Sequence, residues 1–312
     1  MLTVFYKTDT KIVMENSPEE ILIENLIWVD LKNPSSEEKH FVERSLEVNL
    51  QTRQQAEEIE SSSRYWETES LIMANSNFLI RHPVLTNEPV SFILKENILI
   101  SIRNSEVITV AELIKKFETN PRAFSNGFHV FVTLFEIRID LDADLLESIA
   151  NEISAVSKQL TVNSTLDERI ILNITEFQEL CMTMRQNVID KQRVISGILK
   201  SERFPGDTFP KLRVMIKDIG SLLEHASFSF ERLEYLQNTF LGLINIEQNK
   251  IIKIFTVASV VFMPPTLIAS IYGMNFKDLP ELSLSWGYPL SILLMILSST
   301  ATLIYFKRRK WL

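Results

Sequence analysis

The run of residues 254–272 near the carboxyl end constrains this chain most, because it holds no charged side chain over 19 positions. At about 1.5 Å per residue, a helix of that length spans about 28 Å, close to the roughly 30 Å hydrocarbon core of a bilayer. A second uncharged run, 286–306, is followed directly by four basic residues at 307–310. The sequence therefore predicts a multi-pass membrane protein with two spans. By the positive-inside rule its carboxyl end, and with two spans its amino-terminal part, are expected to be cytoplasmic.

One face of the first span is more polar than the rest. Positions that step by three and four share a face of a helix, and here they are Asn249, Ile252, Thr256, Ser259, Met263, Thr266 and Ser270. A polar stripe on a membrane helix faces other protein or a water-filled path, not lipid. Serine and threonine also favour close packing between membrane helices. Taken alone, the stripe favours packing over a pore.

The residues after the first span change that balance. Residues 272–276 read YGMNF, FMPPT precedes them, LPEL and WGYP follow, and the chain ends in YFKRRKWL. In this order the motifs resemble the CorA family of divalent-cation channels, whose signature is YGMNF at the end of the first of two membrane helices. The resemblance is dense over 245–312. It continues more weakly through the preceding part, for instance in WVDLKNP at 28–34.

The resemblance implies a fold class and a function. The fold is an α+β membrane protein with a cytosolic α/β domain, a long stalk helix and two C-terminal transmembrane helices. It forms a funnel-like homo-oligomer, a homopentamer, in the bacterial inner membrane. The function is channel-type uptake of Mg²⁺, and also Co²⁺ and Ni²⁺, down the electrochemical gradient. In the family, Mg²⁺ bound between neighbouring cytosolic domains closes the channel, but no residue of this chain is assigned to that site. Mg²⁺ is thus substrate and regulatory ligand, and no other cofactor is expected.

The pore is expected to form around the polar stripe. One helix cannot surround a pore, so several copies must place their stripes around one axis. Mg²⁺ dehydrates reluctantly; a ring of neutral Asn275 carbonyls suits the hydrated ion, whereas carboxylates would hold it too firmly. Gly273 lets backbone carbonyls approach the same axis. The predicted selectivity residues are Gly273, Met274 and Asn275. The predicted pore-lining residues are Asn249, Ile252, Phe255, Thr256, Ser259, Met263, Thr266 and Ser270. The acidic residues of the external loop are Asp278 and Glu281.

Two further features of the first span bear on the pore. Pro264 and Pro265 have no N–H, so the carbonyls of Val260 and Val261 lose their usual helical donors. Carbonyls without a helical donor are tolerated in membranes where they face protein or a water-filled cavity. Three apolar side chains toward the cytosol are expected to form a collar that closes by dewetting; they are Ile252, Phe255 and Met263.

The preceding part of the chain predicts mixed strands and helices. Apolar runs at 2–7, 11–14 and 23–31 read as strands, Ser35 and Glu38 form a capping box, and residues 95–97 predict a hairpin. Helices are predicted over 128–160, from Thr165 with Glu168 to about 203, and over 210–272. The expected organisation is an α/β domain (1–125), an outer helical hairpin (126–209), a stalk (210–250), the first span (251–272), an external loop (273–288), the second span (289–306) and a basic tail (307–312).

Charge and composition exclude several classes of function. Residues 1–249 hold 25 Lys/Arg against 38 Asp/Glu, a net charge of −13, which argues against nucleic-acid binding. No phosphate-cradling glycine motif occurs, the four histidines show no ligand spacing, and Cys181 is the single cysteine. An enzyme is therefore not expected. The acidic residues of the 128–160 helix are expected on a solvated face; they are Asp140, Asp142, Asp144, Glu147 and Glu152.

Two alternatives stay open from the sequence. The first is a zinc transporter of the ZntB type, which shares the architecture but departs from the Gly-Met-Asn motif that this chain keeps. The second is a non-conducting two-span receptor, for which the 14 residues of the connection between the spans, 276–289, leave little room for an external ligand-binding body.

Overall fold

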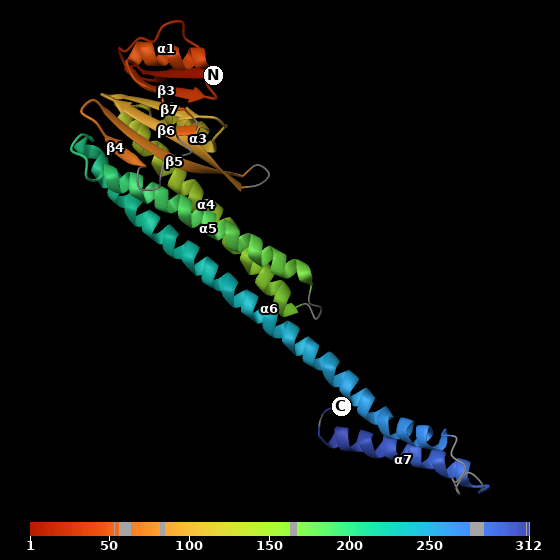
Figure 1. Cartoon of the computed structure of the whole chain (residues 1–312). Coiled ribbons are helices and arrows are strands. Elements are labelled where there is room, and N and C mark those ends of the chain that lie inside the picture. The colour runs from red at the N-terminus through yellow and green to blue at the C-terminus, as the bar shows by residue number, and fades with distance from the viewer. Residues whose placement is uncertain are drawn as a thin grey trace. The chain divides into compact units, whose positions relative to one another are not determined.

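The computed structural model describes residues 1–52, 54–55, 64–81, 85–162, 167–274, 284–309 and 311. They form two compact units, Met1–Leu236 and Gln237–Leu312. The first unit combines a β-sheet with helices, and the second contains the end of helix α6 (Phe209–Tyr272) and helix α7 (Gly287–Arg308) (Figure 1). Helix α6 continues for 64 residues, with both prolines inside it. The predicted helix over 210–272 is therefore confirmed.

The first unit is built on a seven-stranded sheet of order β2-β1-β3-β7-β6-β5-β4. Strands β3 and β7 pair in parallel, and the other neighbouring pairs are antiparallel. The hairpin predicted at 95–97 is confirmed, because β6 turns into β7 through Glu96 in the left-handed conformation (φ 54°). The three predicted amino-terminal strands are also confirmed, the first with its predicted ends and the other two with shifted ends. The strands are β1 (Leu2–Lys7), β2 (Ile12–Asn16), β3 (Leu26–Lys32), β4 (Tyr65–Glu67), β5 (Leu71–Arg81), β6 (Leu85–Lys95) and β7 (Ile98–Arg103).

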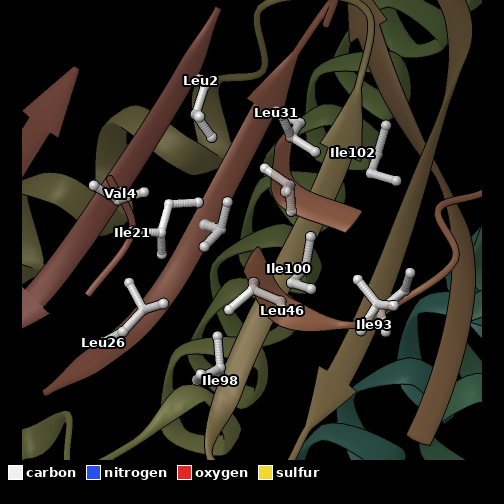
Figure 2. Close-up of a cluster of buried hydrophobic side chains, with 13 residues drawn as sticks. Leu2, Val4, Ile21, Leu26, Leu31, Leu46, Ile93, Ile98, Ile100 and Ile102 are labelled. Atoms are coloured by element: carbon white, nitrogen blue, oxygen red, sulfur yellow. The ribbon is translucent and has the colours of Figure 1, made fainter. Parts of the chain in front are cut away.

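One face of the sheet is aliphatic and lies under helix α1 (Ser36–Leu46). Successive side chains of a strand point to opposite faces, so every second residue of β1, β3 and β7 joins the same core. Figure 2 shows Leu46 of α1 among the strand residues Ile98 and Ile100. The helix begins at the predicted capping box, in which the Ser35 hydroxyl accepts from the backbone N–H of Glu38 and the Glu38 carboxylate accepts from that of Ser35.

The opposite face of the sheet is aromatic. Trp28 of β3 stacks on Phe5 of β1 with ring centroids 4.3 Å apart, and Phe117 meets both rings edge-on. A polar chain crosses this apolar layer: the Trp28 indole donates to Ser101 Oγ (2.9 Å), which donates to the Asp30 carboxylate (2.7 Å). Each buried polar group is thereby paired, as burial requires. Further α-helices of this unit are α3 (Ile108–Thr119), α4 (Gly127–Val162), α5 (Glu168–Ile198) and the first part of α6.

The predicted ends of α5 are wrong. The helix begins at Glu168, and Asp167 is its N-cap, whose carboxylate accepts from the backbone N–H of Arg169 at 2.9 Å. Aspartate caps helices at least as well as threonine, so the residue next to the first turn takes the place predicted for Thr165, which lies outside the described residues. The carboxyl end is Ile198, five residues before the predicted end at 203.

The expectation of a solvated acidic face on α4 is wrong for Asp142. Asp140, Asp144 and Glu147 are exposed, but Asp142 is fully buried. Its carboxylate pairs with Arg138 one turn earlier and with Lys191 of α5, whose Nζ lies 2.9 Å from Oδ2. Arg138 also donates to the Leu79 carbonyl of β5 at 3.0 Å.

Burial of this cluster makes the Lys191 ammonium group easier to deprotonate. Desolvation lowers the pKa of Lys191 to about 8, although the Asp142 carboxylate opposes the change. The Arg138 guanidinium and the Lys191 ammonium both lie about 6 Å from the Phe78 ring centre, at 5.8 and 5.9 Å. Buried charges of opposite sign thus hold α4 and α5 to β5.

The first part of α6 packs by an apolar stripe whose residues recur at helical period. Leu212, Met215 and Ile219 are buried, and the stripe continues through Leu222, Ala226, Leu233 and Leu236. Two polar contacts add to this packing: Arg232 donates to Ser154 Oγ of α4 at 3.0 Å, and Lys211 lies 3.6 Å from Glu136.

Candidate pore-lining helix

The second unit contains two helices that are long and apolar enough to cross a membrane. The apolar window in the last part of α6 has a mean hydropathy of 1.9 and that in α7 of 1.8, and each window is 11% buried. Cores of water-soluble proteins bury such surface, whereas these helices leave large side chains such as Phe262, Leu267 and Ile296 exposed. Their exposed apolar surface is suited to lipid.

Helix α7 lies against one side of α6 (Figure 1). Val257 and Val261 of α6 are buried against Phe306 of α7. The Ser299 hydroxyl of α7 donates to the carbonyl of Val261 at 3.3 Å. That carbonyl is one of the two that the prolines leave without a helical donor, because the residue four positions later is Pro265. A neighbouring helix therefore supplies the donor that the proline removed.

Ser299→Ala should loosen the contact between the two spans. Without the hydroxyl, the Val261 carbonyl has neither a helical nor an interhelical donor, and such bonds in membranes contribute about 1 kcal/mol. We expect the thermal transition of the full-length protein in detergent to fall by roughly 2–4 °C. Ser298→Ala is the matched control, because the Ser298 hydroxyl donates to the Met295 carbonyl of its own helix. Equal losses in the two variants would contradict the role given to Ser299.

The residues of the predicted stripe lie on the side of α6 that α7 does not cover. At about 100° per residue, the stripe falls on the half of the helix opposite to Val257 and Val261. The exposed side chains are Asn249, Ile252, Phe255, Thr256, Ser259, Met263, Thr266 and Ser270. This face is open to another part of an assembly.

The hydroxyl groups of two threonines in the stripe donate hydrogen bonds to backbone carbonyls of α6. Thr256 Oγ1 donates to the Ile252 carbonyl at 2.8 Å, and Thr266 Oγ1 donates to the Phe262 carbonyl at 2.7 Å. A hydroxyl oxygen that donates its one proton still has lone pairs that accept. The exposed face of α6 therefore presents acceptors and no charge within the span.

The signature motif lies at the end of α6. Gly273 continues the helical pattern by donating to the Ala269 carbonyl at 2.9 Å, and Met274 donates to that of Ile271 at 3.3 Å. A β-carbon on Gly273 would lie 3.0 Å from the Ala269 carbonyl oxygen, so a side chain there requires that carbonyl to shift by a few tenths of an ångström. The other predicted residues of this region, Asn275, Asp278 and Glu281, lie outside the described residues.

Acidic residues of the first unit gather near the start of α6 without forming a metal site. Glu136, Asp140 and Asp218 line one cleft together with Lys211. Burial raises the pKa of Asp140, and the negative charge of Glu136 adds to the effect. Within the described ranges, no group of three His, Cys, Asp or Glu side chains is arranged to hold a metal ion. The regulatory site that the resemblance implies is therefore still without assigned ligands.

Sequence reasoning missed Ser299. Nothing in the spacing of α7 singles it out among the serines and threonines of that helix. The one available signal is on the other helix, where Pro265 removes the donor of Val261 and so requires a partner that the sequence does not specify.

The fold and the two apolar helices define a two-span membrane protein whose first span exposes an uncharged polar stripe. A family model described as "CorA-like Mg2+ transporter protein" matches residues 24–308, and the chain belongs to this family.

Relatives with this family's name cover the whole chain. Proteins named "Magnesium transport protein CorA" are 38% identical over 323 residues in Wolinella succinogenes and 33% identical over 316 residues in Escherichia coli K12. Each alignment covers 100% of this chain and 100% of the relative.

Solved structures share the fold. The CorA magnesium transporter of Methanocaldococcus jannaschii matches with a TM-score of 0.87 at 19% identity, covering 100% of this chain and 99% of that one. The cytoplasmic domain of ZntB from Vibrio parahaemolyticus matches 78% of this chain with a TM-score of 0.62 at 15% identity, covering 98% of that domain.

Proposed function

We propose that this chain is the subunit of a Mg²⁺ channel that takes the ion up across a bacterial inner membrane. Membership of the CorA-like family and full-length relatives named as magnesium transport proteins support this function. The observation that carries the mechanism is the exposed face of α6 opposite α7, which offers oxygen acceptors without charge.

An uncharged acceptor surface suits a hydrated divalent cation. Mg²⁺ keeps its octahedral waters, and those waters point their protons outward, so the lining must accept hydrogen bonds. Thr256 and Thr266 can do so because each hydroxyl proton is already bonded to the helix. Carboxylates in the same place would bind the ion firmly and slow its release. The arrangement therefore favours passage over retention.

The driving force in this proposal is the membrane potential. An inside-negative potential supplies about 2.3 kcal/mol per charge per 100 mV, so a divalent cation gains about 4.6 kcal/mol on entry. We propose no enzymatic activity and no energy-coupling site. The transported range is proposed to include Co²⁺ and Ni²⁺.

Assembly and regulation are part of the same proposal. Several copies, a pentamer by resemblance, place their α6 faces around one axis, with both termini in the cytoplasm. The apolar collar of Ile252, Phe255 and Met263 closes the path when Mg²⁺ binds between the cytosolic parts of neighbouring subunits. The net charge of −13 on residues 1–249 is compatible with such cation binding.

The test of transport is uptake into magnesium-depleted vesicles that contain the purified full-length protein. With an inside-negative potential, we expect a Mg²⁺-sensitive dye inside to respond, and to respond less when the vesicles are preloaded with millimolar Mg²⁺. Competition by Co²⁺ and Zn²⁺ separates this proposal from a ZntB-type zinc transporter. Uptake of Zn²⁺ but not Mg²⁺ would overturn the proposal, and uptake of neither would favour the receptor.

Single cysteines should map the water-filled side of α6. We expect cysteine at Thr256, Ser259 or Thr266 to react with small aqueous thiol reagents at least tenfold faster than cysteine at Val257 or Val261, which α7 covers. Native Cys181 gives little background, because burial raises the pKa of its thiol to about 11 and the thiolate is the reactive form. Similar rates around the helix would refute a pore on this face.

A further inference from the structure

The carboxyl end of α7 holds a group of unpaired cations. Lys307, Arg308 and Arg309 are all exposed. Ion pairs with carboxylates hold many cations of the first unit, such as Arg103 with Asp30 at 2.7 Å. In the part of the chain that the structure describes, none of the three cations at the end of α7 has such a partner. An anion from outside the chain can therefore reach them.

Aromatic rings fix the chain around these cations. The Trp311 N–H donates to the Phe306 carbonyl at 3.0 Å. The Trp311 ring stacks on Phe306 with centroids 5.5 Å apart, and the Arg309 guanidinium lies 5.9 Å from the centre of the Tyr305 ring. Trp311 and Tyr305 are 46% and 58% exposed. Half-exposed Trp and Tyr beside a long apolar helix are typical of the membrane–water boundary.

Helix α6 also carries a cation close to the residues that pack against the end of α7. Phe306 is buried against Val257. Lys253 lies one helical turn before Val257 on the same face of α6, beside the end of α7. Both helices are uncharged from this level onward, over 254–272 and 286–306. Both helices thus carry cations where their apolar runs begin.

Two simpler explanations account for part of this arrangement. Cations stabilise a helix carboxyl terminus, and they fix the orientation of a span. Neither explanation requires the ordered aromatic stack. Neither requires two neighbouring arginines, whose planar forks match phosphate oxygens in a way that lysine does not.

We propose that Lys307, Arg308 and Arg309, flanked by Trp311, bind the phosphodiester of an anionic phospholipid such as phosphatidylglycerol. The two arginines hold the phosphate oxygens, and the half-exposed indole lies against the glycerol and upper acyl chain. The proposal rests on the membrane insertion proposed above. It assigns a ligand to residues outside the proposed pore lining.

The test uses full-length protein in phosphatidylcholine vesicles with the substitution Trp286→Phe, so that Trp311 is the one tryptophan left in the second unit. Brominated phosphatidylglycerol or brominated phosphatidylcholine is added in steps, and quenching of tryptophan fluorescence is recorded. We expect brominated phosphatidylglycerol to reach half-maximal quenching at a mole fraction about tenfold lower, because each basic residue at an anionic surface adds to the attraction.

Matched variants identify the residues. The triple change Lys307→Gln, Arg308→Gln and Arg309→Gln should remove the preference for the anionic lipid. The control triple Lys11→Gln, Arg122→Gln and Lys200→Gln removes as much charge from exposed positions of the first unit and should keep it. The pair Arg308→Lys and Arg309→Lys keeps the charge and the orientation signal, and it should lose part of the preference because the planar forks are gone.

Three results would overturn the proposal. Equal quenching by the two lipids in the parent protein would show that no anionic lipid is selected, whatever the triple variant does. Equal losses in the two triple variants would show an effect of net charge alone. Relief of the quenching by glycerol phosphate at concentrations far below that of the lipid would show that a free phosphate, and not the lipid, is the preferred ligand of the cations. Mg²⁺ uptake is measured separately on the same vesicles, so a failed transport assay and a failed lipid assay are distinguishable.

Discussion

Replacing Asn275 with alanine should nearly abolish Mg²⁺ uptake while expression and assembly stay normal. Asn275 follows Gly273 and Met274 directly after the end of α6, although it lies outside the described residues. In the proposed channel its side-chain carbonyl accepts hydrogen bonds from the waters of the ion. One such bond contributes about 1 kcal/mol, so a ring of identical residues loses several kcal/mol per ion at once. The measurement is initial uptake in the vesicle assay, normalised to protein.

Two other substitutions at Asn275 separate a filter from a helix cap. Asn275→Asp should bind cations more tightly and select among them less well, because a charged ring attracts any cation. Asparagine also ends helices in the left-handed conformation, where glycine serves equally well. If Asn275 is only a cap, Asn275→Gly should therefore transport normally. Parental uptake by the glycine variant would remove Asn275 from the proposed filter.

The largest expected effect on stability is at Asp142. Asp142→Ala leaves Arg138 and Lys191 buried without their carboxylate, and breaking a buried pair in this way costs about 3–5 kcal/mol. We expect the thermal transition of the first unit to fall by on the order of 10 °C. Asp144→Ala is the matched control, since Asp144 is exposed on the same helix and should change stability little. Similar transitions in the two variants would show that the buried pair does not hold α4 and α5 to the sheet.

The protonation of Lys191 adds a pH dependence with a definite sign. Its pKa is about 8 in the folded protein, against 10.5 for an unperturbed lysine. Between these values the unfolded chain binds the proton and the folded protein does not, so stability from this group rises with pH across that interval. Below pH 8 both states are charged and the burial penalty is constant. The difference in transition temperature between the parent and Lys191→Met should therefore shift in favour of the parent from pH 8 to pH 10.

Local signals in the sequence predicted the positions of helices and their caps well. Burial and pairing of side chains depend on non-local contacts and could not be predicted in this way. The long helix α6 starts one residue before its predicted position and ends at the predicted residue, because helical periodicity is a local signal. The capping box at Ser35 depends on residues three apart and was predictable for the same reason. Asp142 was not, because its partner Lys191 is 49 positions away on another helix and helical spacing alone places the carboxylate among solvated neighbours.

In the candidate site, too, local spacing predicts some features and non-local contacts decide others. The exposed stripe of α6 follows from a period of three and four, so its residues could be predicted before the structure. Which side of α6 is covered by α7 could not be predicted, since α7 is uncharged over 287–306 and its spacing does not single out Ser299. The contact of Ser299 with Val261 settles that choice.

The parallel pairing of β3 with β7 has a consequence for synthesis on the ribosome. Trp28 pairs with Leu99 and Lys32 with Arg103, so the centre of the sheet cannot close until about 70 further residues have been made. Such long-range pairing is slow compared with local hairpins. The first unit nevertheless ends at Leu236, and the first uncharged run starts at Ile254. Because domains fold in order as the chain emerges, translation allows the sheet to close before the first span is available for insertion.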